Sequence, residues 1–110
     1  MDYPNDADGD ALRRVALTSD MTKPMVVDFA VDVPTEAAGE KIAALAAGRG
    51  YSADVELDEK SQRWTCYCTK TMVATYAAMI AAQTELDELS APFGGKSDGC
   101  GTAGNGRPPA

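Results

Sequence analysis

Residues 25–33, MVVDFAVDV, form the segment that most constrains the fold, because large apolar side chains recur at every second position. Val27, Phe29, Val31 and Val33 fall on one side of an extended chain, and Asp28, Ala30 and Asp32 fall on the other. Successive side chains of a strand point to opposite faces of its sheet. The run therefore predicts a strand with one buried face and one exposed face, which Pro34 ends.

Three segments with helical spacing surround this strand. The first is expected from about Asp8 to Thr18, with Asn5, Asp6 and Asp8 suited to cap its N-terminus. The second follows Thr35 and ends at Gly48 and Gly50, and the third runs from about Thr75 to Ala91. The predicted buried positions are Leu12, Val15 and Ala16 in the first, Ala38, Ile42, Leu45 and Ala46 in the second, and Met79, Ala82, Leu86 and Leu89 in the third.

Two further alternating runs, residues 51–58 and 63–70, flank a polar turn and predict a β-hairpin. On the second run, Trp64, Cys66 and Cys68 share one face, which we assign to the core. Thr65, Tyr67 and Thr69 share the opposite face. Lys70 breaks the alternation, and we expect it to snorkel or to pair with a carboxylate.

The order of these segments is helix, strand, helix, strand, strand, helix, with Lys96 to Cys100 as at most a short edge strand. Without the first helix, this is the split β-α-β order of ferredoxin-like folds. We predict an α+β sandwich with one antiparallel sheet, helices on one of its faces and an extra N-terminal helix. A single domain is expected over residues 1–101, with a flexible Gly/Pro-rich tail over residues 102–110.

Charge narrows the choice of partners. The 110 residues include 17 acidic and 10 basic side chains, for a formal charge of −7. Such a field repels nucleic-acid phosphates and anionic lipids but attracts basic protein segments. With no membrane-length apolar run and no basic N-terminal leader, we expect a cytoplasmic protein whose three cysteines are thiols.

The composition also disfavours enzymatic chemistry. The chain has no histidine, which excludes Ser-His and Cys-His nucleophile systems and histidine-ligated zinc. Asp6, Asp8 and Asp10 resemble the start of a calcium loop, but Ala11 and Leu17 occupy the positions that need glycine and glutamate. The GGKS segment at residues 94–97 follows a helix and lacks phosphate-loop spacing. We therefore predict no enzyme activity, no cofactor and no metal.

The exposed side of the predicted sheet is the candidate functional surface. Its acidic members come from two strands and from the hairpin turn, with one aromatic residue among them. We predict partner binding by Asp28, Asp32, Asp54, Glu56, Asp58, Glu59 and Tyr67.

Five short sequence motifs, in order along the chain, resemble the RraB family of regulators of ribonuclease activity. They are PNDADGDALRR, Lys23-Pro24, Arg63-Trp64-Thr65, Thr69–Val73, and Pro92–Gly95 together with Asp98-Gly99. The resemblance covers about Tyr3 to Gly101. It implies an α+β sandwich domain that binds ribonuclease E, in its arginine-rich C-terminal scaffold, and lowers its endonuclease activity without touching RNA. It implies a protein partner. We expect the chain itself to be a monomer or a weak homodimer.

A hypothesis from another class remains open. The chain could be a ligand- or effector-binding ferredoxin-like domain that dimerises through its open sheet face. Ala30 and Tyr67 would then form a small apolar centre on that face. The carboxylates at alternate positions of two strands argue against this hypothesis.

Overall fold

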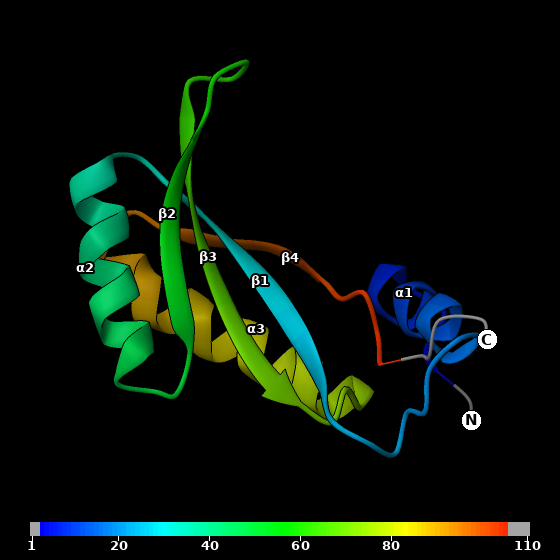
Figure 1. The fold of residues 1–110 in the computed structure, drawn as a ribbon. Coiled ribbons are helices and arrows are strands. Elements are labelled where there is room, and N and C mark those ends of the chain that lie inside the picture. The colour runs from blue at the N-terminus through cyan, green and yellow to red at the C-terminus, as the bar shows by residue number, and fades with distance from the viewer. Residues whose placement is uncertain (1–2, 106–110) are drawn as a thin grey trace.

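The computed structural model describes residues 3–105, in which three helices and one short 3-10 turn accompany a four-stranded sheet (Figure 1). The α+β class predicted from the sequence is confirmed. The elements are α1 (Ala7–Ala16), β1 (Met25–Val33), α2 (Glu36–Ala47), β2 (Ser52–Asp58), β3 (Arg63–Met72), α3 (Tyr76–Ser90), η1 (Ala91–Phe93) and β4 (Lys96–Gly101).

The strands lie in the order β2-β3-β1-β4, and every neighbouring pair is antiparallel. β1 is central, and its register with β3 runs without a break from Met25 opposite Met72 to Val33 opposite Trp64. Consecutive β-α-β units interleaved in this way produce the ferredoxin-like topology. The first and last strands of the repeat, β1 and β4, therefore lie side by side.

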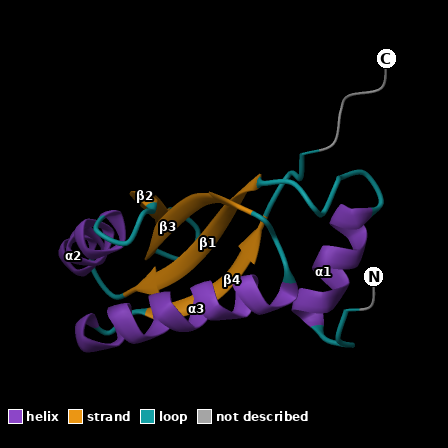
Figure 2. Cartoon of the chain, turned by 90° about the horizontal axis from the view of Figure 1, so that it is seen from below, coloured by secondary structure: helices purple, strands orange, loops and turns teal. Residues whose placement is uncertain are grey.

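Helices α2 and α3 cover one face of this sheet, and no helix among residues 3–105 covers the other face (Figure 2). The covered face holds the core, in which the inward side chains of β1 and β3 are fully buried. They include Val27, Phe29, Val31, Val33, Cys66 and Cys68. Gly39 brings α2 close to β2, since a Cβ atom there would lie 2.8 Å from Cγ1 of Val55.

Each main helix begins at a side chain that caps its free N–H groups. The Asp6 carboxylate accepts a hydrogen bond from the Gly9 N–H at 2.7 Å. The hydroxyls of Thr35 and Thr75 accept from the N–H groups of Ala38 and Ala78, both at 3.1 Å. Polar residues that precede the apolar stripes thus fix where the helices start.

Tyr51, at the start of the hairpin, accounts for the irregular position of Lys70. Its ring is buried edge-on against Phe29, with centroids 6.0 Å apart, and the Lys70 ammonium lies 5.0 Å from its centroid. The hydroxyl donates to Glu85 at 3.1 Å. Burial is the main cause that raises the pKa of Tyr51 to about 12, and the hydrogen bond to Glu85 is the second. Lys70 therefore lays its stem along the core and places its charge on an aromatic face.

Three details differ from the sequence predictions. Leu45 was expected in the buried stripe but is 46% exposed, because the core-facing side of α2 is narrow and centres on Gly39, Ile42 and Ala46. Ala16 was also expected inside and is exposed at the end of α1. The last strand is longer than predicted and pairs with β1 through Gly101.

The segment after β4 is held to the loop between α1 and β1. The Asn105 side-chain amide donates to the carbonyls of Asp20, Lys23 and Pro24, and its oxygen accepts from the Asp20 N–H. Residues 106–110, most of the predicted flexible tail, lie outside the described residues. The division at residue 101 stays a prediction.

Candidate functional site: the open face of the sheet

The seven predicted site residues lie on the open face and on the hairpin that extends it. Asp28 and Asp32 come from β1, Asp54 and Glu56 from β2, and Tyr67 from β3. The strand register places Tyr67 between Asp54 on one side and Ala30 on the other. Tyr67 is 39% exposed, so its ring is open to solvent with the Asp54 carboxylate directly beside it on β2.

Asp32 is the most constrained carboxylate of this face. It forms a two-pronged ion pair with Arg63, in which Nε donates to Oδ1 at 3.0 Å and the second nitrogen contacts Oδ2. Lys96 lies opposite Asp32 in the register of β4 with β1, and its positive charge acts in the same direction. The hydrogen bond from Arg63 is the main cause that lowers the pKa of Asp32 below its ordinary value.

The other β1 carboxylate is oriented by a neutral group. Asp28 accepts a hydrogen bond from the Thr69 hydroxyl of β3 at 2.6 Å. Asp54 and Glu56 on β2, by contrast, form no hydrogen bond or ion pair with other side chains within residues 3–105. Their charges are therefore available to a partner.

Asp58 and Glu59 lie at the tip of the hairpin, which projects beyond the rest of the molecule (Figure 1). The Asp58 carboxylate accepts from the Lys60 N–H at 3.0 Å and the Ser61 hydroxyl at 3.1 Å. The Glu59 carbonyl accepts from the Gln62 amide at 2.7 Å. Gln62 has a φ of 59°, the left-handed conformation that closes this turn. Asp58 therefore shapes the hairpin as well as adding charge to it.

Three charged residues of this region were missed by the sequence analysis. Arg63, Lys96 and Asp98 surround a polar hollow beside the hairpin, together with Asp32, Asp58, Ser61 and Thr65. The alternation of the second hairpin strand already places Arg63 on the same side as Thr65 and could have identified it. Lys96 and Asp98 could not be placed without the pairing of β4 with β1.

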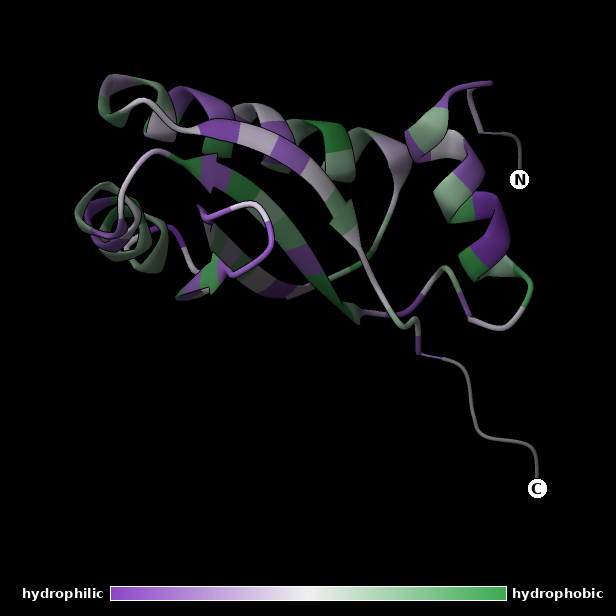
Figure 3. Ribbon diagram, turned by 90° about the horizontal axis from the view of Figure 1, so that it is seen from above, coloured by the Kyte–Doolittle hydropathy of each residue, from purple (hydrophilic) through white to green (hydrophobic). Residues whose placement is uncertain are grey.

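Six carboxylates and two cations are thus gathered on the open face. The carboxylates belong to Asp28, Asp32, Asp54, Glu56, Asp58 and Asp98, and the cations to Arg63 and Lys96. Figure 3 shows the resulting bands of hydrophilic and hydrophobic residues along the strands. The face carries an excess of negative charge, as predicted, although part of it is neutralised at the β4 side.

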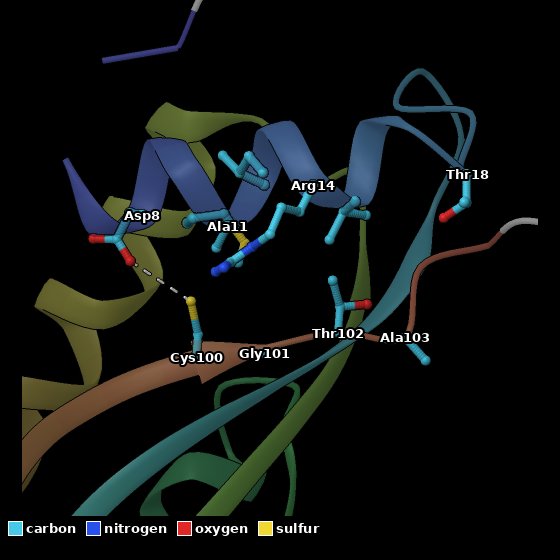
Figure 4. A pocket seen from close by; sticks show the side chains of 11 residues that line it. Asp8, Ala11, Arg14, Thr18, Cys100, Gly101, Thr102 and Ala103 are labelled. Carbon is cyan, nitrogen blue, oxygen red and sulfur yellow. Dashed lines mark hydrogen bonds between the residues drawn. The ribbon is translucent and has the colours of Figure 1, made fainter. Parts of the chain in front are cut away.

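A second hollow, of about 410 Å³, lies between α1 and the end of β4 and was not predicted (Figure 4). Leu12, Val15 and Met79 give it apolar walls, and the Arg14 side chain reaches into it. At the edge of this hollow, the Asp8 carboxylate accepts hydrogen bonds from the Gln83 amide at 3.3 Å and from the Cys100 thiol at 3.9 Å. Burial and the Asp8 charge raise the pKa of Cys100 to about 11, so this thiol is protonated at neutral pH.

The other two cysteines lie side by side in the core. The sulfur atoms of Cys66 and Cys68 are 3.8 Å apart and wholly shielded from solvent. The contact with Cys66, together with burial, raises the pKa of the Cys68 thiol. Within the described residues, no group of three or more metal-ligating side chains converges. Among the helices described, none combines the length and apolar character needed to cross a bilayer.

The fold and this surface define a class: a ferredoxin-like α+β domain with an acidic, uncovered sheet face. A family model described as RraB, regulator of ribonuclease activity B, matches residues 5–102, and the chain therefore belongs to the RraB family. This confirms the resemblance found in the sequence and supports a role in regulating ribonuclease activity. The family is one of regulators and not of enzymes. A search of curated proteins returned no match.

Proposed function

We propose that this protein inhibits ribonuclease E by binding the enzyme through the open sheet face. The part of ribonuclease E that it binds is the arginine-rich C-terminal scaffold. The residues proposed to make contact are Asp28, Asp32, Asp54, Glu56, Asp58, Glu59 and Tyr67. The protein acts in the cytoplasm, without catalysis of its own and without direct contact to RNA. Messenger RNA turnover then changes because less active enzyme is available.

The unpaired carboxylates of β2 are the observation that carries this proposal. Asp54 and Glu56 are exposed and adjacent on one face, with no cation bound to them in the described part of the chain. A guanidinium group can bind a carboxylate through two parallel hydrogen bonds, which makes arginine the natural complement of such a surface. The same surface repels the phosphates of RNA.

Affinity measurements with the two halves of ribonuclease E test the proposal. We expect the scaffold half to bind at low salt and to dissociate as salt increases, because exposed charge pairs are screened. The double variant Asp54→Asn/Glu56→Gln should weaken binding by roughly five- to thirtyfold. Inhibition of RNA cleavage should weaken in parallel.

The variant Glu40→Gln/Glu88→Gln is the matched control. It removes the same two charges from exposed positions on α2 and α3, away from the open face. Its affinity should stay within about twofold of the original protein. If both double variants lose the same affinity, net charge alone explains the binding. If neither half of ribonuclease E binds, the proposed partner is wrong.

A further inference from the structure

We propose that β2 is a strand-addition site, at which an extended segment of the partner pairs with the free edge of the sheet. The segment would carry basic and apolar side chains in alternation. This inference rests on the proposed function for the existence of a protein partner. It adds the backbone geometry of docking and the chemistry of the docked segment.

The position and regularity of β2 support strand addition. β2 is the outermost strand on its side of the sheet, and seven consecutive residues pair with β3 in unbroken register. An antiparallel edge strand directs alternate N–H and C=O groups away from its neighbour, where they can pair with another chain. Peptides that bind in this way obtain affinity from those main-chain hydrogen bonds.

The opposite edge of the sheet is less suitable. The register of β4 with β1 shifts between Phe29 and Val31, and Gly99 adopts a φ of 94°. Bulges and glycines interrupt the regular row of outward groups that a new strand needs. Among the described strands, β2 is therefore the edge that can accept an added strand.

The side chains of β2 specify what the added strand must carry. Asp54, Glu56 and Asp58 lie on the open face of the sheet, where the pairing residues of a partner would lie about 5 Å away. Arginine or lysine at alternate positions matches them. Ala53, Val55 and Leu57 lie on the other side, and Leu57 is 39% exposed, so the intervening positions should be apolar.

The same carboxylates disfavour a second copy of this chain at the edge. Two β2 strands in antiparallel register would place Asp54, Glu56 and Asp58 opposite one another, and like charges directly opposite are destabilising. Acidic residues thus protect the edge against self-association. They leave it open to a basic strand.

A seven-residue peptide with alternating valine and arginine, blocked at both ends, is the probe. We expect it to shift the amide NMR signals of β2 when it is added to the isotope-labelled protein at low salt. Two N-methylated versions carry methyl groups on the valine amides or on the arginine amides. An extended strand points these two sets of N–H groups to opposite edges, so one version should bind at least about tenfold more weakly and the other should bind nearly as well as the parent.

The two N-methylated peptides carry the same charge and differ in apolar surface by a single methyl group. If both bind as tightly as the parent, or if the parent fails to shift the β2 signals, strand addition is wrong. In the complex with the ribonuclease E scaffold, hydrogen exchange of the β2 amides should slow. A scaffold that binds and responds to Asp54→Asn/Glu56→Gln without slowing this exchange would overturn strand addition and leave the proposed function intact.

Discussion

Arg63 is the residue that most alters the charge of the open face. Its ion pair with Asp32 joins β3 to β1, and its side chain also lies beside Asp98. The positive charge of Arg63 therefore neutralises part of the negative charge around the polar hollow. The pair is partly solvated, with the Arg63 side chain 60% exposed and that of Asp32 31% exposed. Its contribution to stability is therefore modest, because solvent screens an exposed ion pair.

Replacing Arg63 with glutamine should raise the pKa of Asp32 toward its ordinary value. Because the folded-state pKa of Asp32 lies below the unfolded value, its stabilising effect is present above about pH 4 and is lost as pH falls through the folded-state pKa. In Arg63→Gln this acid-dependent contribution to stability should become smaller, and the part due to the charge of Lys96 should remain. NMR titration of the Asp32 carboxyl carbon measures the pKa. Chemical unfolding between about pH 2 and 6 measures how the free energy of unfolding depends on pH.

Lys60→Gln provides the control for the same loss of charge. Lys60 lies at the hairpin tip and forms no ion pair within residues 3–105. The pKa of Asp32 should therefore stay low in this variant. An unchanged pKa in Arg63→Gln would show that the ion pair does not persist in solution.

At the scale of the elements, α1 is the least firmly packed helix. It reaches the body of the protein mainly through α3 and the end of β4, and the hollow of about 410 Å³ lies between them. Ala11 faces this hollow and is partly buried. A larger apolar side chain at this position can occupy empty space without displacing the core.

Ala11→Leu should therefore stabilise the protein by about 0.5–2 kcal/mol, measured by chemical unfolding. Ala81→Leu is the control, since Ala81 is exposed in the middle of α3 and the same change there buries no additional area. Its effect should stay within about 0.5 kcal/mol. Destabilisation by Ala11→Leu would indicate that α1 packs more tightly than the structure describes.

The elements were largely predictable because their patterns are local. The alternation in 25–33 gave the bounds of β1, and Thr35 marked the start of α2. Leu45 was misplaced because helical spacing identifies an apolar stripe but not its width. That width depends on how closely α2 approaches β2 at Gly39, which is a tertiary contact.

At the scale of the whole molecule, the open face could be predicted only in part. Its β1, β2 and β3 residues followed from alternation, since each strand has one polar side. Lys96 and Asp98 required the long-range pairing of β4 with β1, and the hollow beneath α1 required the position of a helix outside the ferredoxin-like repeat. No local sequence pattern contains that information.

Cys66 and Cys68 lie under the central strands with no solvent-accessible surface, so an alkylating reagent can reach them only when β3 separates from the helices. In a Cys100→Ser background, their modification should be far slower than that of free cysteine and slower still with Ala11→Leu. Mass spectrometry would follow it, and rapid modification of both would contradict the burial described. The rate at which these two thiols are alkylated therefore measures how often the whole domain opens under native conditions.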